Sequence, residues 1–161
     1  MTKKIEVELQ IISVSDKIPK QECIEAWVTD VLGRFSNSIF AEVCVRIVDE
    51  EEGRSLTKHY FGSDKPTNVL AFPSPTDLLP LPNVRRSIGD IVICAPVVER
   101  EAVAQGKDLS AHWLHLLVHG TLHLLGYDHD ESQAAEQMEA LEKKILASHG
   151  IRDPYSDSYR G

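Results

Sequence analysis

In the first third of the chain, apolar residues recur at every second position in one segment and at helical spacing in another. These spacings predict a strand followed by a helix. Every second side chain is apolar in residues 5–11, which predicts a strand with one solvent-facing side. Residues 19–36 repeat apolar side chains at helical spacing and predict an amphipathic helix. Residues 40–48 are rich in β-branched side chains and predict a second strand. The acidic stretch 49–53 that follows is predicted to be a turn.

The middle of the chain predicts two more strands and a short helix. Residues 66–73 have a short apolar centre between prolines, which suits a strand at the edge of a sheet. The four prolines of 73–82 predict an irregular surface loop. An almost continuous apolar run over 88–94 predicts a strand buried on both faces. A helix is predicted over 96–105, with Gly106 as its stop.

Two helices are predicted in the last third of the chain. The first runs from about Ser110, a plausible cap, to Leu125, and because it is apolar nearly all round it should be buried. The second covers about 131–148, and residues 153–161 look like a frayed tail. At 161 residues we expect a single domain spanning residues 1–161.

The first of these helices carries the pattern of a metal site. His119 and His123 are four residues apart, so they lie on the same helix face. Gly126 can end the helix in a left-handed conformation and return the chain so that His129 reaches the same point. Three imidazoles with an open fourth position are typical of a catalytic zinc ion. The spacing matches the metzincin proteases, except that Gly120 stands in place of their glutamate base.

Five other side chains are candidates for catalytic or structural roles. His112 and His115 share the helix face one to two turns earlier, which favours structural roles or the orientation of a ligand. Asp128 and Asp90 are the candidates for proton transfer or for orienting a ligand, and each could equally be a local hydrogen-bonding residue. His149, at the end of the last helix, is expected to cap carbonyl groups.

Composition limits the classes of partner. The net charge of −8 and pI of about 5.3 argue against a protein that coats nucleic acid by bulk electrostatics. A small basic and aromatic cluster in 54–65 is compatible with either RNA contact or ordinary surface charge. Three scattered cysteines suit free thiols in a reducing compartment, so we expect a cytoplasmic protein. The carboxylates at Glu6 and Glu8 interrupt the apolar residues of 3–9, so we expect this stretch not to act as a signal peptide, and we expect no membrane span because uninterrupted apolar runs are short.

Several segments together resemble the YbeY family of bacterial rRNA-maturation endoribonucleases. The signature is similar to His119-Gly120-x-Leu122-His123-Leu124-x-Gly126-Tyr127-Asp128-His129 of this chain. Residues 65–73, 89–93 and 111–113 are also similar to family segments, in the same order. The resemblance therefore covers most of residues 40–155 and is specific.

The resemblance implies a fold, a cofactor and an activity. The fold is α+β, with a small mixed sheet covered by about five helices and a zincin-like metal helix. By this resemblance we expect one zinc ion to be held by His119, His123 and His129. The implied activity is cleavage of single-stranded RNA in the maturation of the 3′ end of small-subunit (16S) rRNA and in ribosome quality control. The implied partners are ribosomal RNA and the assembling small subunit.

One departure from the family pattern bears on RNA binding. The family carries an arginine after the tyrosine that corresponds to Tyr60, and this chain has Phe61, which cannot make charge-assisted bonds to a phosphate. Lys65 and Arg86 are the candidates for RNA binding, although Arg54, Lys58 and Arg85 are also available.

Three alternatives remain open at this point. The nucleophile is either a metal-activated water, which would cut RNA and DNA alike, or the ribose 2′-OH, which would cut only RNA. A non-catalytic ribosome-assembly factor with structural zinc is the first rival function, favoured by Phe61. A metalloprotease is the second rival, and Gly120 argues against it.

Overall fold

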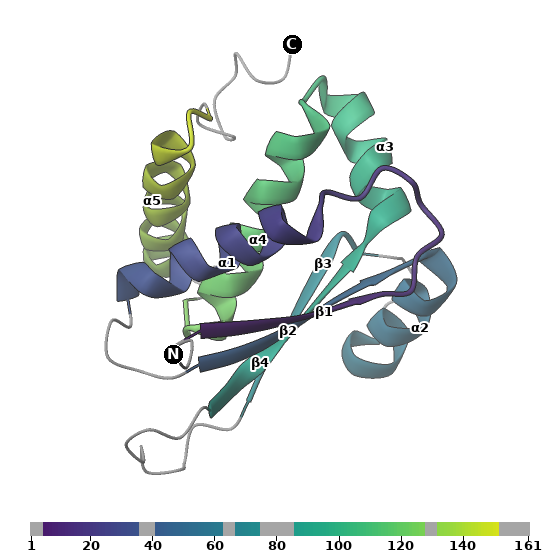
Figure 1. Cartoon of the computed structure of the whole chain (residues 1–161), viewed down its shortest axis with the longest axis horizontal. Coiled ribbons are helices and arrows are strands. Elements are labelled where there is room, and N and C mark those ends of the chain that lie inside the picture. The colour runs from purple at the N-terminus through teal and green to yellow at the C-terminus, as the bar shows by residue number, and fades with distance from the viewer. Residues whose placement is uncertain (1–4, 36–40, 63–66, 75–85, 128–131, 152–161) are drawn as a thin grey trace.

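The computed structural model describes residues 5–35, 41–62, 67–74, 86–127 and 132–151 (Figure 1). It has four strands and five helices in these ranges, which confirms the predicted α+β class. They are β1 (Ile5–Ile11), α1 (Gln21–Phe35), β2 (Ala41–Val48), α2 (Glu50–Phe61), β3 (Val69–Pro73), β4 (Arg86–Cys94), α3 (Ala95–Gln105), α4 (Leu109–Leu124) and α5 (Ser132–Ser148).

The four strands form one mixed sheet in the order β1-β2-β4-β3. β1 pairs with β2 in parallel, and β2 pairs with β4 in parallel with a register shift between Glu42 and Val43. β3 pairs with β4 in antiparallel orientation and forms one edge of the sheet, as predicted for a strand bounded by prolines. β4 lies between two strands, and its residues Ile91 to Cys94 are buried on both faces, which also confirms the prediction.

Helix α4 lies at the centre of the molecule, between the sheet and two other helices (Figure 1). Its residues Trp113 and Leu117 pack against the sheet, in one cluster with Val45, Ile91 and Ile93. On its other side, three residues of α4 pack against α1 and α5 in a second cluster. That cluster consists of Leu114, Val118 and Leu122 of α4, Val31 of α1, and Met138, Ile145 and Leu146 of α5. A helix enclosed in this way must be apolar nearly all round, as its sequence is.

The prediction of a turn at residues 49–53 was wrong, because Asp49 is the N-cap of helix α2 and residues 50–53 form its first turn. Three glutamates occupy its first turn, where negative charge is favoured by the helix dipole. Two of them also anchor the helix: Glu52 pairs with Arg46 of β2 at 2.6 Å, and Glu50 pairs with Arg100 of α3. α2 covers part of the sheet face opposite to α4 (Figure 1).

The other predicted boundaries differ from the structure by a few residues. The cap of α4 is Asp108, whose carboxylate accepts a hydrogen bond from the backbone N–H of Ala111 at 3.1 Å, and not Ser110. Most of the predicted loop at 73–82 and all of the predicted tail at 153–161 lie outside the described residues. The three cysteines are free thiols, and only Cys94 is buried. None of the helices in the described ranges is both long and apolar enough for a membrane span.

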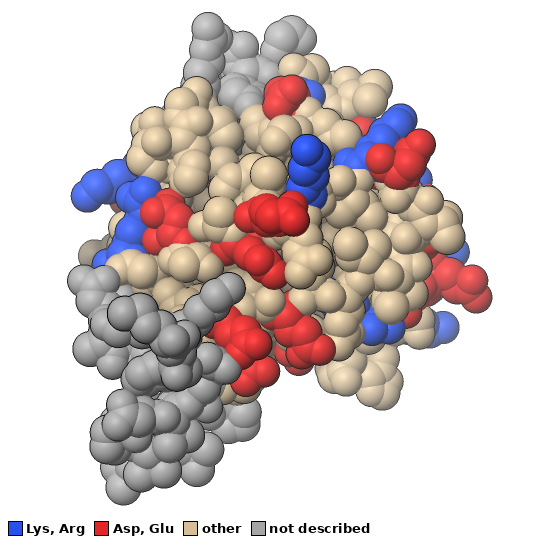
Figure 2. All heavy atoms as spheres, viewed as in Figure 1, with Lys and Arg blue, Asp and Glu red and all other residues tan. Residues whose placement is uncertain are grey.

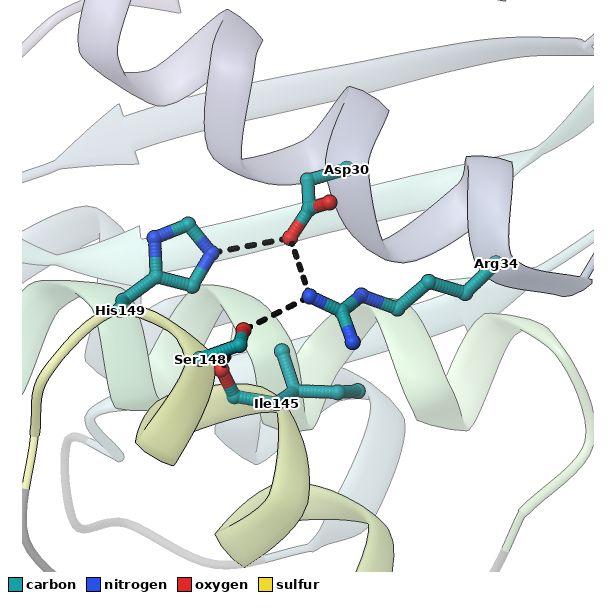
Figure 3. Close-up of polar contacts among 5 residues, drawn as sticks. All are labelled: Asp30, Arg34, Ile145, Ser148 and His149. Carbon is teal, nitrogen blue, oxygen red and sulfur yellow. Dashed lines mark hydrogen bonds and ion pairs between the residues drawn. The ribbon is translucent and has the colours of Figure 1, made fainter.

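A polar cluster joins the end of α5 to α1 (Figure 3). His149 Nε2 lies 2.9 Å from Asp30 Oδ2, and Arg34 donates to Asp30 at 3.1 Å and to Ser148 Oγ at 2.7 Å. His149 was predicted to cap carbonyl groups, and its ring instead contacts α1. Burial raises the pKa of Asp30, but the hydrogen bonds from His149 and Arg34 outweigh it, so the pKa lies below its usual value.

We expect the substitution Asp30→Asn to lower the free energy of unfolding by less than about 1 kcal/mol at pH 7, because the cluster is partly exposed. Since the folded-state pKa of Asp30 is lowered, its contribution is present above the unfolded-state pKa and is lost as the pH falls through the folded-state value. Urea unfolding of both proteins should therefore show a difference at pH 7 that shrinks at about pH 3. The exposed Asp16→Asn variant serves as the control, and an equal effect there would contradict the assignment.

Candidate functional site

The four histidines of α4 form a row along one face of the helix, as the spacing predicts. Ring centroids of His112 and His115 lie 6.4 Å apart, those of His115 and His119 6.4 Å, and those of His119 and His123 4.6 Å. The apolar residues on either side of this row are fixed by packing on the sheet and on α1 and α5. The rigid core therefore determines where the imidazoles lie.

His119 and His123 direct their outer nitrogens at each other. The two Nε2 atoms are 3.1 Å apart. Two nitrogens that bind one zinc ion at about 2.0–2.1 Å in tetrahedral geometry lie roughly 3.4 Å apart, which is close to this separation. His119 keeps 23% of its side chain exposed, so the pair is accessible from solvent. The donor set therefore fits a divalent ion such as zinc.

Glu142 of α5 forms a hydrogen bond with Nδ1 of His119, the ring nitrogen that does not face His123. Its Oε1 atom lies 2.5 Å from His119 Nδ1, and only 1% of its side chain is exposed. A carboxylate that accepts the Nδ1 proton leaves the lone pair on Nε2, which is the form of histidine that binds a metal. Glu142 was not among the residues predicted from the sequence to support the histidines.

The two earlier histidines have buried, structural surroundings. Burial lowers the pKa of His115 despite the opposing effect of Glu142, which favours the neutral ring. His112 is 4% exposed, and its Nε2 lies 3.0 Å from Glu101 Oε1, which also accepts a hydrogen bond from Asn68. Burial raises the pKa of Glu101, but the hydrogen bonds from His112 and Asn68 lower it by more, so the pKa lies below the usual value for a glutamate. These contacts agree with the supporting roles expected for His112 and His115.

Gly126 follows the end of helix α4 and takes the left-handed conformation that was predicted for it. Its φ of 100° is in the region that favours glycine, and the backbone N–H of Tyr127 donates to Leu122 O at 3.1 Å. His129 and Asp128 follow and lie outside the described residues. Within the ranges that the structure describes, no group of three or more His, Cys, Asp or Glu side chains is placed to hold a metal. The third predicted ligand therefore stays a prediction.

Gly120 lies on the side of α4 that packs against the sheet, and it is buried there. A Cβ atom at this position would lie 3.1 Å from Ile91 Cγ2 and 3.3 Å from Val69 Cγ2. The absence of a side chain thus allows α4 to approach β4 and β3 closely. A glutamate at this position would need space that these two side chains fill, which gives a physical reason why the protease base is absent.

Asp90 lies on the opposite side of the sheet from the histidine pair. Its neighbours in β4, Ile91 and Ile93, pack towards α4, whereas Asp90 lines a groove on the other face with Glu8 and Cys44. Burial, with the charges of Asp90 and Glu8, raises the pKa of the Cys44 thiol. Acidic side chains gather over the strands in the middle of Figure 2.

The two predicted RNA-binding residues are not placed relative to the histidines. Arg86 begins β4, but its side chain is not among those described, and Lys65 lies outside the described residues. Their roles stay predictions.

Comparison with known proteins identifies the family. Residues 5–150 match the family model described as "Endoribonuclease YbeY". Proteins named Endoribonuclease YbeY from Halorhodospira halophila and Xylella fastidiosa are both 51% identical to the chain. The matches cover 86% of this chain and 89% of the first relative, and 89% of this chain and 88% of the second.

A solved structure supports the fold. The solution structure of TM1509 from Thermotoga maritima aligns with a TM-score of 0.55 at 23% identity, over 94% of this chain and 99% of that protein. At this identity the likeness concerns the fold alone. The extent of the sequence matches shows that this chain belongs to the YbeY family.

Proposed function

We propose that this protein is a zinc-dependent endoribonuclease that cleaves single-stranded RNA. Its proposed role is maturation of the 3′ end of small-subunit (16S) rRNA and ribosome quality control in the cytoplasm. Its partners would then be ribosomal RNA and the assembling small subunit. The relatives at 51% identity carry the name endoribonuclease, which supports RNA as the substrate class.

The single observation that carries the proposal is the facing pair of imidazoles backed by a buried carboxylate. His119 and His123 present Nε2 atoms 3.1 Å apart, and Glu142 accepts the proton on the far side of His119. With His129, which is proposed as the third ligand, this set would hold one zinc ion. A zinc ion with an open coordination position supplies Lewis acidity to a phosphoryl oxygen or to water.

The other residues in this proposal orient the histidine ligands, accept protons or bind the RNA backbone. Glu142 accepts the proton on His119 Nδ1, and burial lowers the pKa of His115, which favours a neutral ring beside the pair. Asp128, adjacent to His129, is proposed to accept or orient a proton. Lys65 and Arg86 are proposed to contact the RNA backbone, where cations position phosphates. Asp90 is the weaker candidate for proton transfer, because it lies across the sheet from the histidine pair.

The proposal is tested with an unstructured RNA oligonucleotide and protein carrying one equivalent of zinc. We expect cleavage of the single strand, little cleavage of the same strand paired with its complement, and loss of activity after chelation. Activity should return when one equivalent of zinc is added. A DNA strand of the same sequence separates the two possible nucleophiles, because only the 2′-OH route spares DNA.

Two outcomes would overturn parts of this proposal. Cleavage that persists unchanged after complete chelation would remove the metal dependence. Zinc-loaded protein that leaves every RNA intact would favour a non-catalytic assembly factor, for which Phe61 in place of the family arginine is the specific observation.

A further inference from the structure

Three aromatic rings are in contact at the end of α2. The Tyr60 and Phe72 ring centroids lie 5.0 Å apart at an interplanar angle of 61°, and those of Phe61 and Phe72 lie 6.2 Å apart at 38°. Tyr60 and Phe61 belong to the last turn of α2, and Phe72 belongs to the edge strand β3. We call Tyr60, Phe61 and Phe72 the aromatic platform.

The aromatic platform faces solvent. Tyr60 and Phe61 are each 59% exposed, although both are large rings that gain free energy when water is removed from their faces. Single exposed apolar residues are common on protein surfaces, but adjoining exposed rings form a patch of the kind that marks a binding site. The patch therefore calls for a partner with flat apolar faces.

Positive charge lies on the same side of α2 as Phe61. Arg54, Lys58 and Phe61 follow the i, i+4, i+7 spacing, so they form one stripe along the helix. Arg54 and Lys58 are exposed. Glu50 and Glu51 line the same hollow as these two cations, and Glu50 is paired with Arg100. Two cations followed by an exposed ring match a single-stranded nucleic acid, which offers phosphates and unstacked bases side by side.

Negative charge beside the aromatic platform restricts where the phosphates of an RNA strand can lie. Tyr60 and Phe72 also line the groove on the open sheet face together with Glu8, Asp90 and Arg46, and the Arg46 guanidinium is paired with Glu52 at 2.6 Å. The carboxylates of Glu8 and Asp90 therefore leave the groove with net negative charge. Phosphates are repelled there, so the backbone is kept on the side of Arg54 and Lys58. Only an uncharged base can then lie over the rings.

We propose that the aromatic platform is a base-stacking site for unpaired nucleotides of single-stranded RNA, with Phe61 as its principal ring. This inference rests on the proposed function and adds to it a determinant of substrate selection. β3 carries Phe72 at the platform, and its Val69 packs against α4 beside Gly120, one residue from His119. The platform lies on the face of the sheet opposite to the histidine pair, so an RNA strand that contacts both has to pass over the edge strand β3. Bases paired in a duplex cannot stack on the rings, so the platform selects single strands.

The test measures binding of a 2′-O-methyl oligoribonucleotide of unstructured sequence to the full-length zinc-loaded protein. We expect Phe61→Ala to weaken binding about 5- to 30-fold, as loss of one stacked base does. Phe61→Trp should retain the affinity, and its indole fluorescence should be quenched on binding. An oligonucleotide of equal length with abasic positions should bind wild type weakly and show no difference between wild type and Phe61→Ala.

A second variant separates stacking from charge. Lys58→Ala should reduce the slope of log Kd against log salt concentration by somewhat less than one, whereas Phe61→Ala should leave the slope unchanged. Phe61 is exposed, so Phe61→Ala should unfold at the wild-type temperature.

The outcomes distinguish this inference from the proposed function. The platform would be overturned if wild type and Phe61→Ala bind the oligonucleotide with equal affinity. It would also be overturned if Phe61→Ala loses as much affinity for the abasic oligonucleotide as for the one with bases. Either result would count even if wild type cleaves RNA. A base-dependent loss in Phe61→Ala would support the platform even if zinc-loaded protein cleaves nothing, in which case the enzyme proposal fails and RNA binding stands.

Discussion

Replacement of His123 by alanine should abolish stoichiometric zinc uptake and lower the rate of RNA cleavage about a thousand-fold or more. His123 Nε2 is one of the two nitrogens that the structure directs at a common point, 3.1 Å from His119 Nε2. Without it, two protein ligands remain of the three proposed, and the site loses the geometry of a catalytic zinc centre. Metal Lewis acidity is worth several kcal/mol of transition-state stabilisation, and about 4 kcal/mol corresponds to the stated factor.

The measurement pairs metal analysis of dialysed protein with the rate of cleavage of unstructured RNA. His149→Ala is the matched control, because it removes an imidazole that contacts Asp30 at the end of α5. We expect this control to keep one equivalent of zinc and the wild-type rate. His123 is partly exposed, so His123→Ala should remain folded. A folded His123→Ala protein that binds zinc and cleaves RNA at the wild-type rate would contradict the proposed site.

The sequence predicts the central helix and its histidine pair because both depend on local periodicity. Residues spaced by three or four positions share a helix face wherever the helix lies, so His119 and His123 could be paired without tertiary information. β1 and β4 were predicted for a similar reason, since a two-residue period or a continuous apolar run is itself the signal. The edge position of β3 followed from its flanking prolines.

Helix α2 was missed because its burial is slight and its first residues are acidic. Only Gly53 and Thr57 of this helix are buried, so it has no apolar stripe of the usual width. Gly53 looks like a turn residue in the sequence, but a Cβ there would lie 3.3 Å from Cys94 Sγ, so glycine serves close packing. The available signal was the charge pattern, with glutamates in the first turn and Lys58 and His59 in the last.

Glu142 was missed because its contact with His119 spans 23 positions of sequence and two helices. Its signal is a carboxylate on an otherwise apolar face, since Met138, Glu142 and Ile145 follow helical spacing and all are buried. A charged residue at such a position needs a polar partner, because an unpaired buried carboxylate is costly. The sequence can therefore indicate that a partner exists, and only the fold identifies it as His119.

Substitution of Glu142 should weaken zinc binding while leaving all three proposed ligands in place. We expect about a 10-fold loss of affinity for Glu142→Gln and about a 100-fold loss for Glu142→Ala, within the range found when an outer-shell partner of a metal ligand is changed. Glutamine keeps an oxygen that can accept the His119 Nδ1 proton but loses the charge that makes the ring a better ligand. Alanine removes both, so His119 Nδ1 loses its carboxylate acceptor, at a further cost of about 1–3 kcal/mol in stability.

Zinc affinity is measured by competition with a chromophoric chelator, and the position of the His119 proton by nitrogen chemical shifts of the metal-free protein. Glu136→Gln, an exposed change on the same helix, should leave both unchanged. A residue that merely fills the core would lower the unfolding temperature in Glu142→Gln without changing zinc affinity or the tautomer of His119, and that result would contradict the positioning role. Glu142 Oε1 lies 2.5 Å from His119 Nδ1 and 3.8 Å from His115 Nε2, so we attribute a loss of zinc affinity in Glu142→Gln to the orientation and basicity of the His119 imidazole.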